Sequence, residues 1–83
     1  MNYMLGVDPA TVYIGGLTPN ISLSELTAAF STFGLWLPPP INHLDRGYIK
    51  ITYEDPADAK EAIENMNNSV FAGCVLHVNY STH

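Results

Sequence analysis

Apolar and polar side chains alternate without interruption along residues 46–53, and this pattern limits the possible folds more than any other in the chain. A segment with period-two alternation is a strand with one apolar face, which has to be buried, and one face left for solvent or a ligand. Its sequence is RGYIKITY, with Ile49, Ile51 and Tyr53 on one face and Tyr48, Lys50 and Thr52 on the other. The chain therefore contains a sheet that is covered on one side only.

The segment before this strand predicts a strand followed by a helix. Residues 11–17 alternate and stop at a glycine pair, which is typical of a strand that ends in a turn. Ser22 and Glu25 form a capping box, and apolar residues then recur at helical spacing. We therefore expect a helix over residues 23–33 that Gly34 ends.

Three more elements complete the order. Residues 35–42 are apolar but contain three consecutive prolines, which restricts them to a short strand at the edge of a sheet. Asp55 as cap and Pro56 in the first turn start a second helix over residues 56–65. Residues 74–80 alternate again and predict the last strand.

The predicted order βαββαβ specifies an α+β ferredoxin-like sandwich, in which two helices cover one face of a four-stranded antiparallel sheet. The strands over residues 11–17 and 46–53 are then the central pair. Tyr13 and Tyr48 should lie side by side on the open face, and exposed neighbouring aromatics are typical of a binding surface. Residues 10–81 form one domain, and residues 1–9 are expected to be a flexible N-terminal extension.

Composition excludes several classes of function. The formal net charge is −5, with eight acidic and three basic residues, which argues against a broad phosphate-neutralising surface. Cys74 is the only cysteine and the histidines lack short ligand spacing, so we expect no disulfide, metal or other cofactor. The sequence has no apolar run of about 20 residues and no secretory signal pattern, so we expect an intracellular chain without membrane contact.

Two motifs resemble those of the RNA recognition motif (RRM) family. The hexamer VYIGGL at residues 12–17 and the octamer RGYIKITY at residues 46–53 are similar to the family signatures, the second against K/R-G-F/Y-G/A-F-V-x-F/Y. The resemblance covers residues 10–81. Within the family, Gly-Gly-Leu at residues 15–17 and the stretch from Ile63 to Asn79 look similar to the RRM of cyclophilin E-type nuclear peptidyl-prolyl isomerases. The resemblance implies a non-enzymatic, nuclear domain that binds single-stranded RNA in RNA processing.

The resemblance also implies roles for four residues of the two motifs. Tyr13 would stack on a base, Tyr48 would pack against sugars, and Arg46 would reach a phosphate. Lys50 occupies the position where the family stacks a second base on an aromatic side chain. Because such a stack contributes about 1–3 kcal/mol, binding is expected to be weak and carried by base contacts more than by charge.

Other positions leave alternatives open. His77 and Asn79 on the last strand would contact base edges, or would be solvated residues at the sheet edge. Trp36 would fill the core or anchor a partner. Residues 2–5 or a protein partner could cover the tyrosines instead of RNA, which makes a protein-interaction RRM, using the sheet face or the first helix, the alternative function. We expect a monomer in either case.

Overall fold

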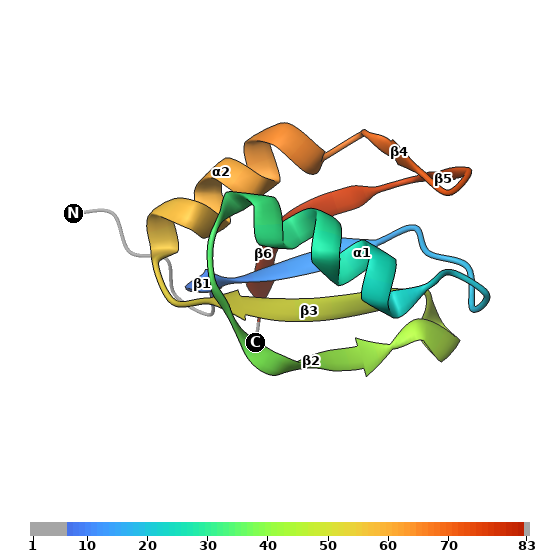
Figure 1. The fold of residues 1–83 in the computed structure, drawn as a ribbon, viewed down its shortest axis with the longest axis horizontal. Coiled ribbons are helices and arrows are strands. Elements are labelled where there is room, and N and C mark those ends of the chain that lie inside the picture. Colours follow the sequence, from blue (N-terminus) through green and yellow to red (C-terminus); the bar gives the residue numbers. More distant parts are fainter. Residues whose placement is uncertain (1–6, 83) are drawn as a thin grey trace.

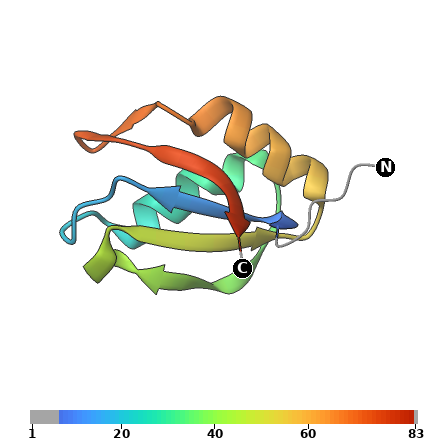
Figure 2. The same cartoon turned by 180° about the vertical axis from the view of Figure 1, so that it is seen from behind.

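Two helices cover one face of a four-stranded antiparallel sheet (Figure 1). The computed structural model describes residues 7–82. In Figure 2, which looks from the opposite side, the strands lie in front of helix α1. The sheet strands are β1 (Val7–Gly15), β2 (Trp36–His43), β3 (Tyr48–Tyr53) and β6 (His77–Thr82). The helices are α1 (Leu23–Phe30) and α2 (Pro56–Met66). The short elements are the 3₁₀ turns η1 (Ser31–Phe33) and η2 (Leu44–Arg46), and the hairpin strands β4 (Val70–Phe71) and β5 (Cys74–Val75).

The strand order of the main sheet is β2-β3-β1-β6, with antiparallel neighbours throughout. The two segments predicted to be central, β1 and β3, occupy the middle positions. The predicted sandwich is therefore confirmed. Because β1 and β3 have neighbours on both sides, their uncovered faces form the centre of the open surface.

The core lies between the sheet and the helices. In β3 every second residue is buried on the helix side, and the residues between them point the other way. In β1 Val12 and Ile14 are buried on that side, and Tyr13 between them is only partly buried. The fully or almost fully buried side chains from the sheet and helices include Val12, Ile14, Ile49, Ile51, Val78, Leu26, Phe30, Ala59 and Ala62. At the end of β3, the buried Tyr53 hydroxyl donates a 2.7 Å hydrogen bond to the Phe30 carbonyl oxygen. Burial, with the nearby Asp58 carboxylate adding to it, raises the pKa of Tyr53.

Strand β1 starts at Val7, earlier than the predicted start at residue 11. Val7 and Asp8 pair with β6, and the register shifts between Asp8 and Val12. At this irregularity the Asp8 carboxylate accepts hydrogen bonds from the Ala10 N–H and the Thr11 hydroxyl, at 2.9 and 2.6 Å. These bonds let the strand continue past a sequence that resembles a turn. Residues 2–5, the alternative cover for the tyrosines, lie outside the described residues.

The first helix is shorter than predicted, because α1 ends at Phe30 and the chain continues as the 3₁₀ turn η1. The Ser31 hydroxyl donates to the Thr27 carbonyl oxygen at 3.0 Å and accepts from the Trp36 indole N–H at 2.8 Å. Trp36 is half-buried against the core. This indole contact ties the end of the helix to the start of β2.

Strand β2 lies at the sheet edge as predicted, but it is not short, because it spans the eight residues Trp36–His43. Its pairing with β3 shifts register between Leu37 and Ile41, where the three prolines stand. The prolines therefore interrupt the pairing without ending the strand.

The predicted last strand, residues 74–80, is divided into β5 and β6. The division falls at Leu76, whose N–H donates to the Ser69 carbonyl oxygen at 2.8 Å and whose carbonyl oxygen accepts from the Asn68 N–H at 2.9 Å. These bonds leave β5 paired with β4 in a small hairpin that the sequence analysis missed.

Candidate nucleic-acid interface

One row of side chains crosses the open face at the level of Lys50. In the strand register Lys50 of β3 stands opposite Ile41 of β2 and opposite Tyr13 of β1, and Tyr13 stands opposite Asn79 of β6. Residues directly opposite in antiparallel strands share a face. The sheet register therefore groups three of the predicted site residues, which are far apart in sequence.

A second row crosses the face at the level of Tyr48. Tyr48 stands opposite His43 of β2 and opposite Gly15 of β1, and Gly15 stands opposite His77 of β6. The ring of Tyr13 extends along its strand over Gly15 and into this row. The Tyr13 and Tyr48 ring centroids are consequently 5.1 Å apart, with 31° between the ring planes.

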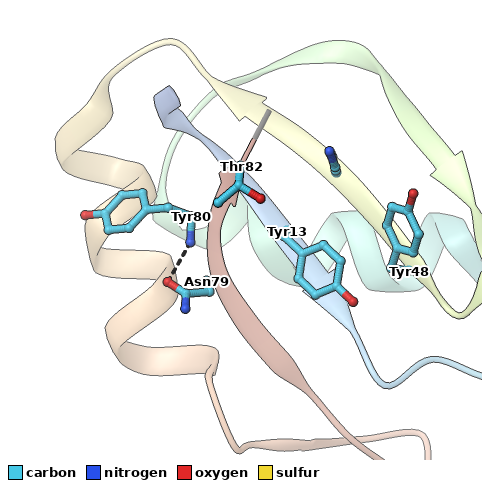
Figure 3. A pocket seen from close by; sticks show the side chains of 6 residues that line it. Tyr13, Tyr48, Asn79, Tyr80 and Thr82 are labelled. Atoms are coloured by element: carbon cyan, nitrogen blue, oxygen red, sulfur yellow. Dashed lines mark hydrogen bonds between the residues drawn. The ribbon is translucent and has the colours of Figure 1, made fainter. Parts of the chain in front are cut away.

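A hollow with a volume of about 490 Å³ lies beside the two tyrosines (Figure 3). It is lined by Tyr13, Tyr48, Lys50, Asn79, Tyr80 and Thr82. The register pairs Tyr80 with the buried Val12, so its ring belongs to the helix side of the sheet, and in Figure 3 that ring points away from Tyr13. Tyr80 and Thr82 were missed by the sequence analysis. Both lie at the C-terminal end of β6, where the alternation of side chains between the two faces of a strand does not by itself predict which residues line a common hollow.

The side chain of Asn79 has a defined orientation. Its Oδ1 accepts a 2.8 Å hydrogen bond from the backbone N–H of Tyr80. A backbone N–H can only donate, so the atom that faces it has to be the amide oxygen. The amide nitrogen of Asn79 is then the end of this side chain that can donate to a ligand.

The two remaining predicted residues lie outside the lining of this hollow. Arg46 ends the turn η2 and is exposed. Gly47 follows with φ of 85°, and its carbonyl oxygen accepts a 3.0 Å hydrogen bond from the Leu17 N–H, so the turn is tied to the loop after β1. His77 is exposed at the far end of the Tyr48 row. The structure thus brings Tyr13, Tyr48, Lys50 and Asn79 together and leaves Arg46 and His77 at the periphery.

His43 belongs to the open face, although the sequence analysis weighed it only as a metal ligand. Its ring centroid is 4.9 Å from that of Tyr48, with 33° between the planes. The sequence pattern that could have placed His43 on the open face is the two-residue spacing of Ile41 and His43 in β2. The prolines before Ile41 obscure that pattern.

Half of the eight acidic residues lie away from the open face. Glu54, Asp58, Glu61 and Glu64 lie on α2 or directly before it, on the covered side, whereas Lys50 lies on the open face. Asp8 is an exception, because its carboxylate accepts from the Thr11 hydroxyl, which contacts the Thr52 hydroxyl. The open face is therefore less acidic than the net charge of −5 suggests.

None of the helices in the described part of the chain is long and apolar enough to cross a membrane.

A two-layer α+β sandwich with neighbouring aromatic rings on its open sheet face is the architecture of the sheet-based class of RNA-binding domains. The model of the RNA recognition motif family matches residues 12–77, a stretch that contains both tyrosines and the octamer, and the chain belongs to this family. The resemblance seen in the sequence motifs is thus confirmed.

Three similar proteins illustrate the relationship. The chain is 37% identical over 73 residues to an uncharacterized RNA-binding protein of Schizosaccharomyces pombe, a match that covers 83% of the chain and 63% of that protein. It is 32% identical over 87 residues to serine/arginine-rich splicing factor 7 of Mus musculus, which covers 96% of the chain and 30% of that protein. The solved structure of the Rna15 RRM with bound RNA (GU) has a TM-score of 0.75 and 19% identity, and the match covers 89% of this chain and 84% of that one.

The chain spans less than two thirds of the length of these two relatives. Neither name mentions an isomerase. The finer resemblance to cyclophilin E-type proteins stays a prediction.

Proposed function

We propose that this domain binds single-stranded RNA through the open face of its sheet. The observation that carries the proposal is the pair of rings, Tyr13 and Tyr48, held 5.1 Å apart on the centre of the uncovered face beside a hollow. Recognition of RNA sequence needs unstacked bases and aromatic faces that receive them. Membership in the RNA recognition motif family and the RNA bound to the Rna15 domain support the same reading.

In this proposal a base stacks on Tyr13, and Tyr48 packs against the sugars. Asn79 and Lys50, which line the hollow next to these rings, donate hydrogen bonds to base or phosphate oxygens. Arg46 reaches a phosphate from the turn before β3, and His77 contacts the RNA from β6. These roles follow the family pattern, projected onto the positions that the register brings to one face.

Binding is weak and depends mainly on base contacts. Lys50 stands where the family places a second stacking aromatic, and a base–aromatic stack contributes about 1–3 kcal/mol. Only Arg46 and Lys50 are basic on or near this surface. Few counterions are then released, so affinity falls only shallowly with salt concentration.

The domain is a binding module that catalyses no reaction and acts in the processing of messenger RNA in the nucleus. The similarity to a splicing factor and to an RNA-binding protein supports this context. The proposed unit is the monomer, because the ring pair and the hollow are built from one chain. The domain proposed over residues 10–81 is extended at both ends by the sheet, which runs from Val7 to Thr82.

The test is a titration of ¹⁵N-labelled protein with random-sequence RNA hexamers, followed by amide chemical shifts. We expect shifts for amides of β1, β3 and β6 around the hollow, and unmoved amides on the exposed side of α2. If the sheet amides stay unmoved at millimolar RNA, RNA binding is excluded. Movement of the same amides by a protein partner only would establish the protein-interaction alternative.

A further inference from the structure

The aromatic surface of the open face extends beyond the two tyrosines to the edge strand. Tyr48 has a ring neighbour on each side, with Tyr13 at 5.1 Å and His43 at 4.9 Å. Both distances are close to the roughly 4.8 Å spacing between strands of a sheet. The three rings therefore form one row that crosses β1, β3 and β2 at right angles to the strands.

We propose that His43 is a third base-stacking position, which supplies on β2 the ring that the Lys50 position lacks. This inference rests on the proposed function, because it assigns one more nucleotide to the same RNA-binding face. Its chemical partner is the face of a nucleobase in a single-stranded RNA that crosses the sheet from β1 toward β2.

The ring geometry suits stacking. Successive planes in the row are inclined by 31° and 33°, far from a perpendicular edge-to-face arrangement. Neighbouring ring planes are therefore similarly inclined, which is the arrangement that bases stacked along the row require. Imidazole rings stack on bases as the other aromatic side chains do.

The turn after His43 orders the backbone that carries this side chain before any ligand arrives. The Leu44 N–H donates to Asn42 Oδ1 at 2.9 Å, and the Gly47 N–H donates to the Leu44 carbonyl oxygen at 3.1 Å. Leu44 also packs against the core. An ordered backbone and the ring contact with Tyr48 reduce the conformational freedom that His43 loses on binding, so more of its stacking energy contributes to affinity.

The neighbourhood of His43 on β2 is apolar and accessible. Ile41 and Leu37 stand opposite Lys50 and Thr52 of β3, and are 50% and 52% exposed. Ile41 lies two residues from His43 on the same strand and the same face. A base stacked on the imidazole would cover part of this apolar surface and remove it from water, which favours binding of a nucleotide at this position.

The test compares three variants at His43 for binding of a random-sequence RNA hexamer by fluorescence anisotropy at fixed salt. His43→Ala should raise Kd about five- to tenfold, in the range expected for loss of one stack. His43→Phe, which keeps a ring without the imidazole nitrogens, should stay within about twofold of the wild type. His43→Lys, which keeps a cation without a ring, should behave as His43→Ala does. In the wild type, RNA should move the imidazole ring protons of His43 upfield, the signature of a base stacked on the ring.

The outcomes separate this inference from the proposed function. If His43→Ala binds as the wild type does while Tyr13→Ala is impaired, the third position is wrong and the RNA-binding face remains. Equal binding by His43→Lys and His43→Phe would overturn stacking in favour of a charge contact. Absence of any RNA binding by the wild type would overturn both proposals. Should His43→Ala fail to fold, the Phe and Lys variants and the wild-type ring protons still decide.

Discussion

Gly15 provides the space in which the ring of Tyr13 lies: a Cβ atom on Gly15 would stand 2.5 Å from the Tyr13 hydroxyl oxygen and 2.8 Å from Cζ. The two residues are two positions apart on one strand and face the same side of the sheet. Since Gly15 also stands opposite Tyr48, the ring of Tyr13 is brought next to Tyr48. The glycine thus determines where the aromatic pair forms.

Gly15→Ala should move the Tyr13 ring without unfolding the domain, because the atoms that must shift are the far end of one side chain. We expect about a three- to tenfold rise in the Kd for RNA hexamers, within the contribution of one stack, and a melting temperature near that of the wild type. In a Tyr13→Ala background the same change should have no further effect on Kd, and this double-mutant cycle is the control. Additive effects of the two substitutions on the Kd would contradict the conclusion that Gly15 acts on RNA binding through the Tyr13 ring.

Tyr13→Ala should weaken RNA binding by about 1–3 kcal/mol and change the stability of the fold only slightly, since the ring lies on the open face and not in the core. Binding assays and thermal melts followed by circular dichroism should be run together. Val70→Ala is a matched control, because it removes a side chain that is 69% exposed on the hairpin and not part of the ring row. Equal loss of binding and stability in Tyr13→Ala would assign Tyr13 to the core.

Lys50→Phe should tighten RNA binding by about 1 kcal/mol, because an aromatic ring between Tyr13 and Ile41 restores the missing stack. Removal of one charge should also flatten the dependence of log K on log salt by up to about one unit. The measurement is a salt series of binding isotherms, with sedimentation to verify a monomer, because one more exposed ring favours self-association. Weaker binding by a folded, monomeric variant would refute the stacking account of this position.

Tyr53→Phe should destabilise the fold by about 1–3 kcal/mol near neutral pH, because the buried Phe30 carbonyl oxygen loses its donor. Burial raises the pKa of Tyr53 above the usual tyrosine value of 10.0. Above about pH 10 the unfolded chain releases this proton while the folded chain keeps it, so the free energy of unfolding falls as pH rises. Urea melts between pH 7 and 11 should therefore show a smaller difference between wild type and Tyr53→Phe at high pH. A constant difference would mean that Tyr53 ionises in the folded state as it does in the unfolded one.

Local periodicity predicted the element order, the sandwich and the outward direction of Tyr13 and Tyr48, because alternation and capping are properties of neighbouring residues. It was wrong at the ends of elements. The turn-like Asp8 and Pro9 concealed the first part of β1, since their place in the sheet depends on pairing with β6. The alternation of residues 74–80 likewise concealed the β4–β5 hairpin, which depends on hydrogen bonds of Leu76 with Asn68 and Ser69.

The sequence by itself determined which side chains leave the core, because side-chain parity in a strand follows from the backbone. Only the tertiary structure decided which of them meet: Tyr13 with Gly15 beneath it, Tyr48 beside it, and His43 beyond. These contacts depend on the register between β1, β3 and β2, strands that are distant along the chain. A shift of one residue would turn each row to the opposite face, and register is set by the packing of the whole sheet against its helices.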